Sequence, residues 1–146
     1  MSQRQKLPTR ERVFIESLKY HGFRKTIRRK NLKFNYGYVI PATTKEDATG
    51  TDFWVKMPRD DRLFPVQLTQ RGVKIHRQKK DFSPDALASL IKIADKRVRE
   101  KKNRCYRHGI AFVLVSDYNQ RHTKPKIAQS DIRALRFALF HLKRWF

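Results

Sequence analysis

Two neighbouring segments carry the residues with the clearest chemical potential. Asp52 opens a run rich in aromatic and branched residues (52–57), and Gln67 and Thr69 alternate with apolar residues in a second run (62–69). A short segment of turn-forming residues separates the runs, which predicts a β-hairpin. Because side chains alternate along a strand, Gln67 and Thr69 share one face. The hairpin therefore predicts a small site lined by oxygen atoms.

The charge of the chain points to a polyanionic partner. Its 146 residues include 35 Lys and Arg against 13 Asp and Glu, which gives a formal net charge of +22. Such an excess repels itself unless a polyanion neutralises it, and nucleic acid does so with release of condensed cations. Charge does not separate DNA from RNA. A membrane surface is not expected as partner, because no basic amphipathic helix with a lipid-type face stands out.

The basic residues gather in three segments that we expect to meet phosphates. The first, 24–33, holds six cations, no acid and several apolar residues that can anchor it. The second follows the hairpin, and the third closes a predicted helix. The candidate nucleic-acid-binding residues are Arg24, Lys25, Arg28, Arg29, Lys30, Lys33, Arg71, Lys74, Arg77, Lys101, Lys102 and Arg104.

Length and composition are typical of one globular domain, 9–146, preceded by a flexible N-terminal segment, 1–8. The apolar share of 39% suffices for a core, and no stretch approaches the length of a transmembrane helix. The N-terminal residues lack the apolar run of a secretory signal, so we expect a cytoplasmic protein. Cys105 is the single cysteine, which excludes an internal disulfide and a cysteine zinc site.

Apolar periodicity predicts the order helix, three strands, helix, strand, helix. The helices are expected from Thr9 to about Gly22, from Pro84 to about Arg99 and from Ser130 to the end. The strands are expected at 36–41, at the two hairpin runs and at 109–115, where continuous apolar character is typical of a strand buried on both faces. The fold class is therefore α/β, with a mixed sheet and helices packed against it.

The acidic hairpin and this order of elements resemble the PD-(D/E)XK nuclease-like superfamily, which includes restriction endonucleases and Holliday-junction resolvases. The resemblance covers about Arg10 to Val115, and the last helix is an addition. It implies a restriction-endonuclease-like core and magnesium-dependent hydrolysis of phosphodiesters. Magnesium prefers hard oxygen ligands, and it activates water and stabilises charge on the attacked phosphate.

The resemblance also implies roles for individual residues. Asp52 matches the family's metal-binding acid, and Gln67 matches the acid-or-Gln position on the next strand. A glutamate of the first helix often joins the site, and Glu11 or Glu16 can fill that role, with Glu46 as a further metal ligand. The next motif position is a lysine in the family but is Thr69 here. The work of that lysine would fall to Lys56, Arg71 or Lys74, of which Lys74 is our catalytic candidate.

Two other interpretations remain open at this stage. Asp52 can cap its strand or pair with a nearby arginine, with Gln67 and Thr69 as exposed hairpin residues. The chain can equally be a non-catalytic structural RNA-binding protein, for example one associated with the ribosome or another nucleoprotein particle. The charge fits this class as well, and the absence of the motif lysine favours it. The oligomeric state is not indicated by the sequence.

Overall fold

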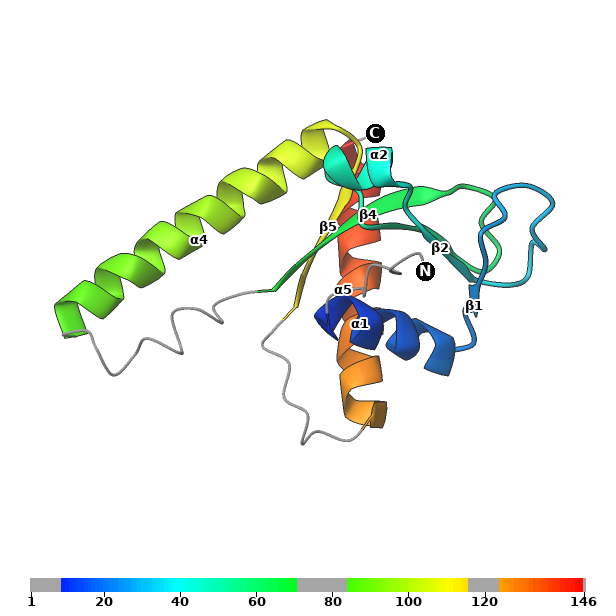
Figure 1. The fold of residues 1–146 in the computed structure, drawn as a ribbon, viewed down its shortest axis with the longest axis horizontal. Helices are drawn as coiled ribbons and strands as arrows, with labels where there is room; N and C mark the ends of the chain where they lie inside the picture. The colour runs from blue at the N-terminus through cyan, green and yellow to red at the C-terminus, as the bar shows by residue number, and fades with distance from the viewer. Residues whose placement is uncertain (1–8, 71–83, 116–123, 146) are drawn as a thin grey trace, which may run out of the picture.

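The protein folds as an α/β structure around one five-stranded sheet (Figure 1). The computed structural model describes residues 9–70, 84–115 and 124–145. Residues 1–8, and the basic segment that follows the hairpin with Arg71, Lys74 and Arg77, lie outside this part. The elements are α1 (Thr9–Tyr20), β1 (Arg24–Lys25), β2 (Tyr38–Pro41), α2 (Thr44–Ala48), β3 (Phe53–Lys56), β4 (Phe64–Gln70), α4 (Pro84–Arg107), β5 (Ala111–Val115) and α5 (Lys124–Trp145).

The sheet is mixed and its strands lie in sequence order, β1-β2-β3-β4-β5. The strands from β2 to β4 form an antiparallel meander, whereas the outer pairs β1–β2 and β4–β5 are parallel. Parallel neighbours need a crossover connection, and α4 lies in the one between β4 and β5. The predicted α/β class, with a mixed sheet and a C-terminal helix, is confirmed.

Helices α1 and α5 pack together over one face of this sheet. The ring of Phe14 on α1 lies 5.5 Å from the ring of Phe53 on β3, measured between centroids. Val66 pairs with Ala111 across β4 and β5, and both are fully buried in the same cluster as Leu135 of α5. Burial of these apolar side chains is what holds the first and last helices of the chain to the strands between them.

In Figure 1, helix α4 begins far from the sheet, and its last turns lie next to it. With 24 residues it is about 36 Å long at 1.5 Å per residue. Cys105 and Tyr106 are buried in the core. Gly109 has a φ of 73°, and the bond from Ile110 N to Cys105 O (2.9 Å) closes the helix. None of the described helices combines the length and apolar character needed to cross a bilayer.

Several element boundaries differ from the sequence prediction. Helix α4 runs to Arg107 rather than to about Arg99, because its last turn is anchored by buried side chains after the apolar periodicity has faded. Helix α5 begins at Lys124, within residues predicted as loop, and not at Ser130. Helix α2 and the two-residue strand β1 were not predicted, since each is too short to show a period.

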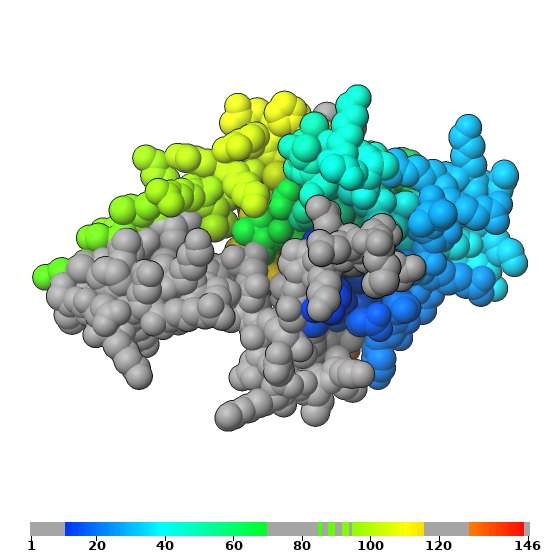
Figure 2. Space-filling view, in the orientation of Figure 1, coloured from blue at the N-terminus to red at the C-terminus, as the bar shows by residue number. Residues whose placement is uncertain are grey.

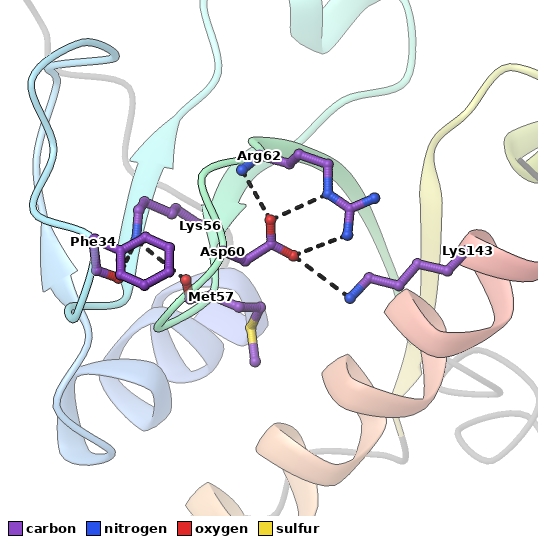
Figure 3. A network of polar contacts seen from close by, with 6 residues as sticks. All are labelled: Phe34, Lys56, Met57, Asp60, Arg62 and Lys143. Atoms are coloured by element: carbon purple, nitrogen blue, oxygen red, sulfur yellow. Dashed lines mark hydrogen bonds and ion pairs between the residues drawn. The ribbon is translucent and has the colours of Figure 1, made fainter.

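A buried lysine fastens the residues that follow the first basic segment to the sheet. Lys56 ends β3 with only 1% of its surface exposed. Its Nζ donates hydrogen bonds to the backbone oxygens of Phe34 (3.0 Å), Tyr36 (2.8 Å) and Met57 (3.2 Å), of which Figure 3 draws the first and last. The rings of Phe34 and Tyr38 also lie within 6 Å of it. The segment between β1 and β2 is therefore ordered, as its apolar residues predicted.

An ion-pair network joins the turn of the hairpin to α5 (Figure 3). Asp60 accepts hydrogen bonds from Nε and a terminal nitrogen of Arg62, both at 3.1 Å. Nζ of Lys143 on α5 lies 3.5 Å from the same carboxylate. The hydrogen bonds from Arg62 are the main reason that the pKa of Asp60 falls to about 2. This acid therefore has a structural role, consistent with its place in a turn.

Candidate functional site

The short helix α2 and the turn after it place Asp52 beside the neighbouring strand β4. Thr43 caps α2, and its hydroxyl accepts a hydrogen bond from Glu46 N while Glu46 accepts one from Thr43 N. Gly50 ends the helix with a φ of 100°, and the bond from Thr51 N to Glu46 O (3.0 Å) completes the turn. The chain then enters β3 with Asp52 N donating to Val66 O at 2.8 Å.

The structure brings Asp52 and Gln67 together. Oδ2 of Asp52 accepts a hydrogen bond from the backbone nitrogen of Leu68 (2.7 Å) and one from Nε2 of Gln67 (3.0 Å). The same Nε2 also donates to Leu68 O at 3.1 Å, so two acceptors fix the orientation of the Gln67 side-chain amide. None of the ion pairs among the described residues includes Asp52. The expected pairing of Asp52 with a nearby arginine is not seen there.

Three carboxylates from three elements influence one another at this point. Partial burial, and then the charges of Asp52 and Asp47, raise the pKa of Glu11 on α1 to about 7. Burial also raises the pKa of Asp52, against the hydrogen bond from Leu68 N, and the charge and hydrogen bonding of Asp47 raise it further. Glu11, Asp47 and Asp52 form what we call the acidic cluster. Asp47 therefore raises the cost of ionising both Glu11 and Asp52, and Asp52 raises the cost of ionising Glu11.

Sequence reasoning missed Asp47 and favoured its neighbour Glu46. The carboxylate of Glu46 is held by Arg29, whose NH1 donates to Oε2 at 2.7 Å, and by the cap of α2. The bond from Arg29 and then that from Thr43 N lower the pKa of Glu46 to about 2. The sequence T-T-K-E-D contains the capping pattern, in which the glutamate is used by the cap and the acid after it is not.

Of the two glutamates of the first helix, the structure places Glu11 at the cluster. Glu16 is exposed and forms an ion pair with Lys19 at 3.4 Å, on the outer surface of α1. Glu11 is half-buried, and Asp52 and Asp47 both act on it. Of the two glutamates, Glu11 is therefore the one positioned to join the candidate site.

The cation that acts on Asp52 comes from α4. The charge of Lys101 lowers the pKa of Asp52, and it also opposes the rise that burial causes in the pKa of Cys105, one turn further along. Lys56, proposed from the sequence, lies four residues beyond Asp52, about 13 Å along the strand, and its amine is committed to three carbonyls. Arg71 and Lys74 lie outside the described residues.

Thr69 stands two residues beyond Gln67 on β4, paired with Leu114 of β5. Its Oγ1 is inaccessible to solvent and makes no hydrogen bond within the described part of the chain. The structure therefore brings Asp52 and Gln67 together and adds Glu11 and Asp47, whereas Thr69 makes no hydrogen bond to any of them.

Those predicted basic residues that the structure describes lie at or near the surface. In Figure 2, atoms of β4 reach the surface between α2 and the last turns of α4, with the first basic segment beyond α2. Arg24 covers the ring of Tyr36 at 4.0 Å, and Arg29 covers that of Trp54 at 5.4 Å. The exposed cations of this surface are Arg24, Lys25, Arg28, Arg29, Lys30, Lys33 and Arg104, and Lys101 and Lys102 are half-buried.

Known proteins do not extend these observations. Comparisons of the chain with protein-family models, with curated proteins and with solved structures find no match. The functional argument therefore depends on the geometry and charge of the site itself.

Substituting Glu11 by Gln should stabilise the protein above neutral pH. The folded-state pKa of Glu11, about 7, lies above the ordinary value of 4.5, so the native state binds more protons between these two values. Stability contributed by this group therefore falls as the pH rises from about 4.5 to 7. With allowance for partial exposure, we expect Glu11→Gln to gain about 1 to 2 kcal/mol at pH 8 and little at pH 4.5.

Urea unfolding of both proteins at the two pH values measures this difference. Glu16→Gln, which removes an exposed carboxylate from the same helix, is the matched control and should leave the pH profile unchanged. A Glu11→Gln variant that is no more stable than the wild type at pH 8 would contradict the raised pKa of Glu11.

Proposed function

We propose that this chain binds nucleic acid and hydrolyses phosphodiesters at Asp52 in a magnesium-dependent reaction. The observation that carries the proposal is the acidic cluster beside Gln67, in a protein of net charge +22. Burial and neighbouring carboxylates raise the pKa of Glu11 and of Asp52, and this arrangement is costly unless a cation neutralises the charge. A divalent cation and a phosphate backbone would together satisfy both kinds of charge.

The order of elements supports a PD-(D/E)XK nuclease-like fold for the proposal. Helix α1, the meander β2-β3-β4, helix α4 and strand β5 follow the family's order of one helix, three strands, a helix and a strand. Asp52 lies at the start of the second meander strand and Gln67 lies on the third, as the resemblance implies. Thr69 at the lysine position remains a departure from the family's motif.

The donor set fits magnesium in its chemistry. Within the described residues no three His, Cys, Asp or Glu side chains form a group that could hold a metal. Magnesium is commonly held by one or two carboxylates together with waters and substrate phosphate, so a third protein ligand is not required. Asp52, with Glu11 or Asp47, would supply those carboxylates, and Gln67 can offer its amide oxygen. When bound, the ion would activate water and stabilise negative charge on the phosphate.

The other residues have roles that follow from their positions. Gln67 and Leu68 N orient the Asp52 carboxylate through Oδ2. Lys101 brings a positive charge to the site from α4, where the family has a lysine on the strand. The first basic segment would contact phosphates, and Lys56 holds the residues that directly follow this segment.

A second function, non-catalytic structural RNA binding, is favoured by one observation. Thr69 replaces the motif lysine, and its hydroxyl is buried without a hydrogen bond among the described residues. A protein of this class, for example one associated with the ribosome, would bind RNA equally well with Asp52 intact or replaced. Sedimentation with ribosomal subunits, with and without Asp52→Asn, measures this directly.

The catalytic proposal predicts cleavage that depends on Asp52 and on the metal. Branched, duplex and single-stranded DNA and RNA are incubated with Mg²⁺ or Mn²⁺ and analysed on denaturing gels. We expect cleavage of at least one substrate, loss with EDTA, and a rate reduced about 10²-fold or more in Asp52→Asn, since the metal supplies several kcal/mol of charge stabilisation.

Asp61→Asn is the matched control for that experiment, because Asp61 is an exposed acid in the hairpin turn. It should cleave at the wild-type rate. Cleavage that survives in Asp52→Asn would remove Asp52 from the mechanism. Binding without cleavage of any substrate would leave the structural RNA-binding function.

Binding itself should depend steeply on salt. If about six to ten phosphates are contacted, affinity falls about 10³- to 10⁵-fold between 50 and 200 mM salt. Arg28→Ala, which removes an exposed cation of the first basic segment, should lower the salt slope by about 1. Arg62→Ala is the control, since Asp60 already holds that guanidinium. A flat salt profile, measured by fluorescence anisotropy, would argue against binding to the phosphate backbone.

A further inference from the structure

The outer face of α5 exposes two aromatic rings that the core does not use. Phe137 is 66% exposed and Phe140 is 63% exposed, and a spacing of three residues places them on the same side of the helix. The apolar residues that α5 does bury point to the opposite side, into the core formed with α1 and the sheet. These are Ile132, Leu135, Ala138, Leu139 and Leu142.

Arginines surround the two rings. Arg133, Arg136 and Arg144 are exposed, and their helical spacing puts them beside Phe137 and Phe140. The guanidinium of Arg144 lies over the Phe140 ring at 6.0 Å from its centroid. We call these five residues the aromatic–basic face.

The aromatic–basic face carries no carboxylate. Between residues 129 and 144 the only acid is Asp131, which is 1% exposed and accepts a hydrogen bond from Ser17 on α1 at 2.7 Å. Positive charge on this side of α5 is therefore not neutralised by the helix itself, and an anionic occupant is the one that complements it.

The residues of the aromatic–basic face also limit the kinds of molecule that can bind there. A second copy of the chain would bring a net charge of +22 against the same arginines, so self-association is opposed. A stable hydrophobic protein interface needs a contiguous apolar surface, whereas the exposed large apolar side chains of the described part of α5 are limited to two rings. Two rings flanked by cations match the bases and phosphates of single-stranded nucleic acid.

We propose that the aromatic–basic face of α5 binds single-stranded nucleic acid, with bases stacked on Phe137 and Phe140 and phosphates on the arginines. The bases of a duplex are already stacked on one another and are not free for such contacts. The proposal rests on the proposed function, in that the chain binds nucleic acid, and it names single strands as the class bound at this second surface.

The test is fluorescence anisotropy with three labelled probes: a single strand of about 12 nucleotides, an abasic strand of the same length, and a duplex. The Phe137→Leu/Phe140→Leu variant keeps apolar side chains but removes the rings. We expect it to bind the base-bearing single strand about 10- to 100-fold more weakly than the wild type, with affinities for the other two probes within about twofold.

Tyr20→Leu is the matched control, because Tyr20 is a 61% exposed ring on α1 without this arrangement of arginines, and it should change no affinity. Equal binding of the base-bearing and abasic strands by the wild type would overturn the proposal without any variant. An unchanged affinity of the double variant for the single strand would also overturn it. Neither result would affect Asp52-dependent cleavage, whereas failure of the wild type to bind any probe would remove both proposals.

Discussion

The partial burial of Glu11 and Asp52 beside the charge of Asp47 is the constraint on which this account depends. Burial and then the charges of Asp52 and Asp47 raise the pKa of Glu11, and burial and Asp47 raise the pKa of Asp52. The fold nevertheless holds them together through the cap of α2, the turn at Gly50 and the hydrogen bonds from β4 to Asp52. In a protein with nearly three times as many cations as acids, this concentration of carboxylates is the feature that most needs a functional explanation.

The basic surface and the acidic cluster explain each other when nucleic acid is the ligand. The cations around α2 and the end of α4 would bring phosphates to the surface, and a metal at the carboxylates would meet them there. Lys56 contributes indirectly, since it ties the residues after the first basic segment to the sheet through the backbone oxygens of Phe34 and Tyr36. The aromatic–basic face of α5 adds a separate surface, which offers ring stacking rather than charge alone.

Much of the sheet and part of the site were predictable from the sequence. The alternation of residues in the two hairpin runs placed Gln67 opposite the start of β3, so its meeting with Asp52 followed from strand geometry. The sequence offered Glu11 and Glu16 of the first helix and did not distinguish them, because the rotation of α1 against the sheet depends on packing. Asp47 was not predicted, since α2 has five residues and no apolar face of its own.

The cation that acts on Asp52 could not be predicted from the sequence either. Lys101 was predicted to meet phosphates, but its approach to Asp52 depends on where α4 rejoins the sheet, and that point is set by buried Cys105 and Tyr106. Local periodicity carries no information about such long-range packing, whereas capping patterns and strand alternation do specify their immediate neighbours.

Calorimetric titration of Mg²⁺ into the nucleic-acid-free protein at pH 8, where Glu11 is ionised, tests the central claim most directly. The account predicts saturable binding to the wild type, its loss in Asp52→Asn and its retention in Glu46→Gln, because Arg29 and the cap of α2 already occupy Glu46. Absence of saturable binding to the wild type, or equal binding by Asp52→Asn, would contradict the proposal that the acidic cluster exists to hold a metal ion.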